Sequence, residues 1–371
     1  MKLLRFNFPI LLLISVILYS CGGQANKNQS DNTADDFIAQ WIDTSTSPGS
    51  DFFRYATGNW MKNNPIPDAE RRWGIGNLVQ EEVFSKLKAL SEDAAKDEKA
   101  PEGSNRQRIG AFWSSAMDSA TIESLGIKPL NEELARIEAI TDLKGIREVV
   151  SRQQVVGCSP MFDFAPYQDE MNSESVSLHL YQGGLGLPDR DYYFIDDSRN
   201  KNIREEYVKH IANMLTLSGM DGKIAAAASK DIMKLETSLA GASRKLEDLR
   251  DPYANYNKLA VSQFNAANTN IDLRYLLDAM GLQKVDTVVI GQPEFFIHLD
   301  KQLKSVSIDT WKAYLRWSLL SGFSSCLNSS FDQEHFNFYG KVLTGVKTQR
   351  PRWKRVLNQE EDYLGDALGQ L

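Results

Sequence analysis

The sequence has few of the residues that most often hold metal ions. It contains four histidines, His179, His210, His298 and His335, and no two of them are four residues apart. The chain therefore has no His-Glu-x-x-His helix that would present two imidazoles to one zinc ion. It also lacks the Gly-x-Ser-x-Gly, phosphate-loop and dinucleotide-binding patterns. We therefore expect no catalytic residue and no metal site within these 371 residues.

Two of the histidines occupy positions that predict their surroundings. Glu206 and His210 are four residues apart in a helical pattern, which indicates a pair on the helix surface rather than a metal site. His179 alternates with apolar residues in a predicted strand. That alternation places His179 on the polar face of the strand, where we expect it to be solvated.

Cysteine is also scarce, and three cysteines are too few for a disulfide framework. Cys21 lies in the N-terminal segment, which leaves Cys158 and Cys326 in the body of the chain. An oxidising compartment would permit one bridge between these two, although no sequence pattern brings them together. We expect two buried free thiols.

The N-terminus has the order of a secretion signal. A basic start at residues 2–5 precedes an apolar stretch, residues 6–18, which is too short to span a bilayer. Residues 18–21, LYSC, resemble a bacterial lipobox, so we expect a signal peptide over 1–20 and a lipid on Cys21. Tyr19 is unusual in that box, and simple cleavage nearby is the alternative. Residues 21–36 are almost free of apolar side chains and predict a flexible tether. These features predict a lipoprotein of the cell envelope, periplasmic or on the outer membrane.

The composition of the chain excludes some partners and folds. There are 49 acidic and 42 basic residues, a net charge of −7, which argues against binding to nucleic acid. Apolar residues make up 42% of the chain and aromatic residues 10%, which is enough for a globular core. No repeat with a period of about 20–50 residues is visible, so a helical solenoid is not expected.

Apolar residues beyond the tether recur mostly with helical spacing. This spacing predicts helices within residues 79–90, 109–117, 142–157, 203–219 and 228–239. Residues 176–181 alternate instead, which predicts a strand, with 161–165 as its partner in a small hairpin. Residues 91–105 are polar and contain Pro and Gly, which predicts an exposed connection.

Three further segments have distinctive sequences with plain physical explanations. DFFRYATGNW, residues 51–60, predicts a helix that packs an aromatic face into a core, and the prolines of NPIPDAERRWG, residues 64–74, fix a turn after it. GLGLPDRDYY, residues 184–193, predicts a loop whose glycines permit close backbone approach or positive φ. RPRWKR, residues 350–355, predicts a charged helix start rather than an anion site, since the chain is acidic.

Taken together and in this order, the segments at 51–74, 184–193 and 350–371 resemble the neprilysin and endothelin-converting-enzyme family of zinc metallopeptidases. The resemblance implies a mainly α-helical fold, in which the hairpin predicted above would be a small β element. It also implies that the chain is the N-terminal half of a two-lobed enzyme that hydrolyses small peptides. Residues 37–371 would be the N-terminal domain. Within it, residues 37–90 would pack on the catalytic lobe and 106–371 would form the covering lobe. Without the catalytic lobe, the chain should expose apolar surface.

The resemblance also implies one substrate contact. An arginine before the aromatic–glycine pair of the 64–74 motif holds the carboxylate end of a peptide in this family, and Arg72 matches it. A guanidinium suits that role because its two nitrogens match a carboxylate. A structural surface ion pair is the alternative for Arg72. A second family arginine is replaced here by Gln80, which favours a looser endopeptidase.

The catalytic half of the family has no counterpart in this sequence. The zinc cofactor, its ligands and the catalytic groups belong to the C-terminal half, so we expect this chain to be inactive alone. Leu364, Leu368 and Leu371 fall in an apolar stripe that reaches the last residue, which suggests that the helix is cut short. The alternatives are a non-catalytic peptide-binding or scaffold lipoprotein derived from the family, or a helical solute-binding surface lipoprotein of another family.

Overall fold

The computed structural model describes residues 38–371. The predicted signal peptide, Cys21 and the tether therefore lie outside the described residues. Contacts divide the described chain into two compact units, residues 38–66 and 67–371, and each is described by itself. No helix within residues 38–371 is long and apolar enough to cross a membrane.

The smaller unit consists of a turn of 3₁₀-helix, η1 (Ala39–Trp41), and α2 (Phe52–Asn63). Asp51 begins α2 by accepting a hydrogen bond from the backbone N–H of Arg54. The prediction of an aromatic face packed into a core is wrong for Phe52 and Phe53, which are 68% and 67% exposed. A unit of this size has too little chain to build a core that would cover them.

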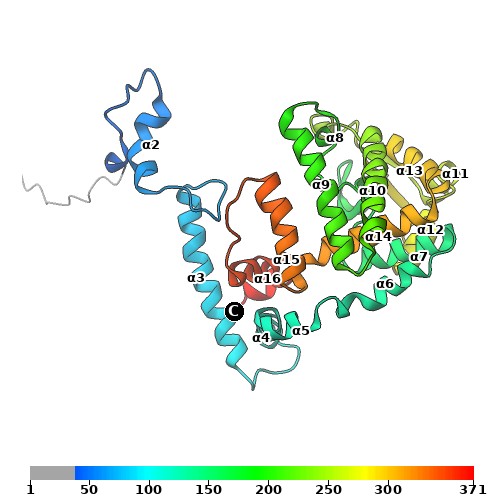
Figure 1. Ribbon diagram of the computed structural model, residues 1–371, viewed down its shortest axis with the longest axis horizontal. Coiled ribbons are helices and arrows are strands. Elements are labelled where there is room, and N and C mark those ends of the chain that lie inside the picture. The colour runs from blue at the N-terminus through cyan, green and yellow to red at the C-terminus, as the bar shows by residue number, and fades with distance from the viewer. Residues whose placement is uncertain (1–37) are drawn as a thin grey trace, which may run out of the picture. The chain divides into compact units, whose positions relative to one another are not determined.

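The larger unit is mainly helical (Figure 1). Its α-helices are α3 (Ile75–Lys96), α4 (Asn105–Met117), α5 (Ser119–Leu125), α6 (Asn131–Glu138), α7 (Leu143–Val155), α8 (Asp191–Phe194), α9 (Ser198–Leu217), α10 (Gly222–Ala242), α11 (Val261–Ala267), α12 (Leu273–Ala279), α13 (Pro293–Ser305), α14 (Ile308–Phe323), α15 (Ser329–His335) and α16 (Arg352–Leu368). Short 3₁₀ turns are η2 (Lys128–Leu130), η3 (Asp248–Arg250) and η4 (Ser324–Cys326), and η5 (Phe336–Leu343) is a π-helix.

A four-stranded sheet lies among these helices. The predicted hairpin is confirmed as β1 (Phe162–Asp169) and β2 (Asn172–Gln182). β4 (Thr287–Ile290) pairs in parallel with β2, and β3 (Asn257–Ala260) pairs with β4, so the order is β1-β2-β4-β3. The sequence did not predict β3 and β4, because four residues are too few to show an alternating pattern.

The main core is built around helices that the apolar spacing predicted. α9 and α10 pack side by side, and both contact α14 (Figure 1). Ile203, Tyr207 and Ile211 on α9 are fully buried, as the stripe in the sequence requires. The predicted N-cap of α7 is confirmed, since the Asp142 carboxylate accepts the N–H of Gly145 at 2.8 Å.

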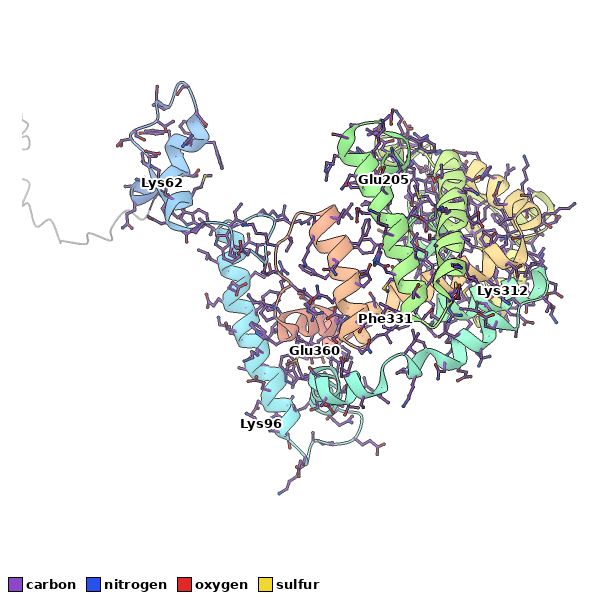
Figure 2. All side chains as sticks on the ribbon, viewed as in Figure 1. Lys62, Lys96, Glu205, Lys312, Phe331 and Glu360 are labelled. Carbon is purple, nitrogen blue, oxygen red and sulfur yellow. The ribbon has the colours of Figure 1, made fainter. Side chains whose placement is uncertain are left out.

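α3, α4 and α16 pack together with two smaller clusters of buried side chains. Phe84 meets Trp353 edge-to-face, and the buried hydroxyl of Ser91 donates to the Glu360 carboxylate at 2.7 Å. Figure 2 shows Glu360 where α16 lies beside α3. The predicted connection at 91–105 begins too early, because α3 continues to Lys96. α16 ends at Leu368, short of the last residue of the predicted stripe.

Two predictions about histidines are wrong. His179 is 0% exposed, because the rings of Tyr167 and Tyr181 cover it on the outer face of the sheet and Glu170 binds its Nε2 at 2.9 Å. His210 is also buried. Its Nδ1 lies 2.9 Å from a carboxylate of Glu334 on α15, rather than pairing with a residue of its own helix.

The two cysteines of the body are free, as expected, but only Cys158 is buried. Cys326 ends the short turn η4 and is exposed, which corrects the prediction of two buried thiols.

Candidate functional site

The segment that carries Arg72 lies between Pro67 and the start of α3. It has no regular secondary structure, and Gly74 precedes the first residue of the helix. The backbone N–H of Gly74 donates to the Asn77 side chain at 3.0 Å, which fixes the junction between segment and helix. We call residues 67–74 the arginine segment.

The arginine segment is held by residues 347–350, which are almost 280 positions away in sequence. The backbone N–H groups of Lys347 and Thr348 both donate to the carbonyl of Asp68, at 3.0 and 3.2 Å. The guanidinium of Arg350 donates two hydrogen bonds to the Glu70 carboxylate, at 2.7 and 2.5 Å. Two of the motifs recognised in the sequence are therefore joined by a two-pronged ion pair.

Residues 347–350 are themselves anchored to the helices. The buried carboxylate of Asp332 on α15 accepts hydrogen bonds from Gln349, at 2.9 Å, and from Arg355, at 2.8 Å. Arg355 on α16 also donates to the carbonyl of Arg350. The support for the arginine segment thus reaches two helices of the larger unit.

Arg72 lies at the surface of this supported segment. Neither Arg71 nor Arg72 has a hydrogen bond or an ion pair within the described part of the chain, and both are exposed. The alternative of a structural surface ion pair for Arg72 therefore finds no partner among residues 38–371. Gln80, which stands where the resemblance implies a second arginine, is exposed on α3.

The basic segment RPRWKR is confirmed as a charged helix start with structural partners. Arg350 binds Glu70, Lys354 binds Glu81 and Arg355 binds Asp332. The remaining arginine, Arg352, donates to the carbonyl of Ala116 on α4. Because these cations are all engaged, they do not form a free patch that would bind an anion.

A second feature centres on the loop GLGLPDRDYY. The Glu236 carboxylate on α10 accepts hydrogen bonds from the hydroxyls of Tyr193, at 2.6 Å, and Tyr207, at 2.9 Å, and from the N–H of Gly186. The expected role of the glycines is confirmed. Gly184 has φ of +73°, and a Cβ on Gly186 would lie 1.8 Å from the Tyr207 oxygen.

Burial dominates the electrostatics of this cluster. Glu236 has no cationic partner among the described residues, and burial raises its pKa to about 7. Burial also raises the pKa of Tyr193 and of Tyr207 well above the usual range. The loop lines a cavity of about 420 Å³. Glu236 is not among the residues predicted from the sequence, although its place in the apolar stripe of α10 beside Ile232 and Leu239 is a usable signal.

The described residues do not fit the zinc ion that the resemblance implies. Within residues 38–371 no three His, Cys, Asp or Glu side chains are gathered so as to hold a metal ion. Of the buried histidines, His179 is hydrogen-bonded to Glu170 and His210 to Glu334. Among the described residues, neither histidine has a hydrogen bond to a second carboxylate.

The chain is similar to known proteins over about nine tenths of its length. The family model described as peptidase family M13, in its N-terminal part, matches residues 48–371. Rat endothelin-converting enzyme 1 is 28% identical over 345 residues, which cover 90% of this chain and 45% of that protein. Human membrane metallo-endopeptidase-like 1 is 26% identical over 362 residues, again 90% of this chain and 45% of the relative. The chain therefore spans less than half the length of these curated relatives.

Solved structures show the same relationship. The zinc metalloprotease ZMP1 of Mycobacterium tuberculosis, crystallised with an inhibitor, superposes with a TM-score of 0.85 at 28% identity. The superposition covers 89% of this chain and 50% of that one. The mainly helical fold with a small sheet is thus that of the N-terminal lobe of such enzymes. From the family match over residues 48–371, the chain belongs to peptidase family M13.

Proposed function

We propose that this chain is the non-catalytic part of a zinc metalloendopeptidase that hydrolyses small peptides, and that Arg72 contacts the substrate. The observation that carries the proposal is the unpaired guanidinium of Arg72 on a segment that is otherwise fixed by ion pairs and backbone hydrogen bonds. A free guanidinium on a fixed support is well suited to bind the terminal carboxylate of a peptide. Membership of peptidase family M13 supports the reaction class.

The proposed partner is the catalytic remainder of the enzyme, which would supply the zinc ion and the catalytic groups. The surface of α3 favours such a partner. Ile75, Leu78, Val79 and Val83 are between 41% and 57% exposed and follow one another at helical spacing. An apolar helix face of this kind on a folded unit is typical of a surface that another domain or chain covers.

Attachment to the membrane through a lipid on Cys21 belongs to the same proposal. Its support is the order of basic start, apolar stretch and LYSC in residues 2–21. Mass spectrometry of the protein from a bacterial envelope fraction tests it. We expect an N-terminal fragment that begins at Cys21 and carries acyl chains. A fragment that begins elsewhere without acyl chains would contradict it.

The peptidase proposal is tested by an assay of the purified chain. With zinc and a quenched fluorescent peptide, residues 22–371 alone should produce no hydrolysis, and hydrolysis by this chain would overturn the proposed division of labour. Sequencing the gene past codon 371 provides a second test. A downstream frame with His-Glu-x-x-His supports the enzyme, whereas its absence favours the non-catalytic peptide-binding or scaffold protein.

A further inference from the structure

The carboxylates nearest to Arg72 in sequence are all occupied by other cations. Asp68 binds Lys347 at 2.9 Å, Glu70 binds Arg350, and Glu81 binds Lys354. All three cations come from residues 347–354. This basic stretch therefore neutralises the acidic residues on both sides of Arg71 and Arg72 and leaves those two guanidiniums uncompensated.

Of these three pairs, the one between Glu70 and Arg350 has the best-defined geometry. The Glu70 side chain is only 10% exposed and that of Arg350 is 30% exposed, against 60% and 76% for Asp68 and Lys347. Both oxygens of Glu70 are engaged, by Nε and Nη2 of Arg350. A two-pronged pair fixes orientation as well as distance, so it constrains the backbone at residue 70.

The pair also faces a local competitor. Glu70 is two residues from Arg72, and a Glu70 carboxylate without a partner would be the nearest anion in sequence for the Arg72 guanidinium. An anion supplied by the chain itself occupies the site at high effective concentration. Arg350 holds Glu70 and removes this competition.

We propose that Glu70 and Arg350 are positioning residues for substrate carboxylate recognition by Arg72. Arg350 fixes the arginine segment onto α15 and α16 through Asp332 and Arg355, and it prevents Glu70 from binding Arg72. This inference rests on the proposed function, in which Arg72 meets the carboxylate end of a small peptide.

The test compares acetyl-Gly-Phe-Leu with a free carboxylate and the same peptide as its C-terminal amide. Affinities of both for the chain from residue 22 to 371 are measured by NMR titration, and hydrogen exchange of the amides at 69–73 is followed in parallel. The variants are Arg72→Ala, Arg350→Met, Glu70→Gln and the charge swap Glu70→Arg with Arg350→Glu. Arg106→Met is the matched control, since Arg106 is 34% exposed and pairs with Asp93 and Asp97 at the far end of α3.

We expect the native chain to prefer the free acid by about tenfold, the contribution of a charge-assisted hydrogen-bonded pair. Arg72→Ala should abolish the preference. Arg350→Met should reduce it by at least about threefold and speed exchange at 69–73, whereas Arg106→Met should change neither. Glu70→Gln should speed exchange but retain more of the preference than Arg350→Met, because no carboxylate competes. The charge swap should slow exchange again.

The possible failures are distinguishable. If Arg350→Met leaves both the preference and the exchange unchanged, the positioning inference is wrong. If Arg72→Ala keeps the preference, or the native chain shows none, the proposed role of Arg72 is wrong. Exchange at 69–73 then still decides whether Arg350 positions the segment. If Arg350→Met speeds exchange and the preference stays intact, Arg350 is purely structural and the inference is overturned.

Discussion

The hydroxyl of Tyr193 donates a 2.6 Å hydrogen bond to the carboxylate of Glu236, which lies entirely inside the protein. Tyr207 donates to the same carboxylate from α9, and the N–H of Gly186 donates from the glycine loop. Three parts of the chain therefore meet at one acidic group that has no cation beside it in the described structure. Such a group makes folding stability depend on pH.

The free energy of unfolding should fall as the pH rises through the range in which Glu236 loses its proton. Its pKa is about 7 in the folded chain and about 4.5 as an ordinary glutamate, so the folded state holds the proton more tightly. The stability that Glu236 contributes is complete below pH 4.5 and is lost between pH 4.5 and 7. The difference amounts to about 3 kcal/mol.

The Glu236→Gln variant provides the measurement for this prediction. The unfolding free energy of the variant minus that of the native chain, measured by urea unfolding at several pH values, should rise by about 3 kcal/mol between pH 4.5 and 8. The difference between the two proteins is needed because His335 also changes stability with pH. Burial lowers the pKa of His335 to about 4, so both proteins lose stability as the pH falls below about 6.5, and this loss cancels in the difference. Parallel curves for the two proteins would show that Glu236 does not titrate in this range.

Gly186 should not tolerate even a methyl group. Its Cβ would lie 1.8 Å from the Tyr207 oxygen, and Tyr207 is fully buried against Trp317. Gly186→Ala should therefore cost about 1–3 kcal/mol or more of unfolding free energy, measured by urea titration. Gly222→Ala on α10 is the control, since nothing lies within 4 Å of its Cβ, and it should be neutral or slightly stabilising. Equal effects of the two substitutions would contradict the prediction.

The spacing of apolar and capping residues along the chain predicted the helices well. Contacts between residues that are distant in sequence could not be predicted from such spacing. The Asp142 cap and the buried face of α9 follow from residues a few positions apart. The link between Glu70 and Arg350 joins positions 280 residues apart, and no spacing rule encodes it. His179 alternates like a solvated residue, but its burial depends on the aromatic neighbours that the hairpin and its register bring to the same face. A periodic pattern records which side chains share a face and does not record what covers that face.

Ser91 and Glu360 should respond differently to substitution. Burial raises the pKa of Glu360, and the Ser91 hydroxyl is the group that donates to it. Ser91→Ala leaves the carboxyl without this donor and should cost about 1–3 kcal/mol. Glu360→Gln keeps an acceptor for Ser91 and removes a buried ionisable group, so it should cost less than Ser91→Ala at pH 8. Thermal unfolding of both variants measures the two losses of stability. A larger loss for Glu360→Gln than for Ser91→Ala would contradict the role of Ser91 as the donor to a buried carboxyl group.

The two thiols of the body should differ in reactivity. Cys158 is buried, and burial raises its pKa to about 11, whereas Cys326 is exposed. A thiolate is the reactive form, so a thiol reagent at pH 8 should label Cys326 quickly and Cys158 only after unfolding. Peptide mapping of the chain from residue 22 onward measures both. Fast labelling of Cys158 under native conditions would contradict its buried position.

In the proposed two-part enzyme, the exposed face of α3 should be dispensable for folding and necessary for association with the catalytic half. Val79 and Val83 are 57% and 44% exposed, and the buried side of the helix is formed by Phe84, Ser91 and Ala94. Val79→Glu with Val83→Glu should therefore change the unfolding free energy by less than about 0.5 kcal/mol, as surface substitutions do.

Urea unfolding measures the effect on stability, and co-purification with the separately produced catalytic half of the proposed enzyme measures the effect on association. We expect the native chain to bind that half and the double variant to bind it at least about tenfold more weakly, because two charges would be buried in an apolar interface. Glu82→Lys with Lys86→Glu is the matched control on α3, since these exposed residues form an i,i+4 ion pair that the swap preserves. If the valine variant unfolds, the face belongs to the core of this chain. If it binds as tightly as the control, the catalytic half docks elsewhere, and the exposed stripe on α3 requires a different occupant.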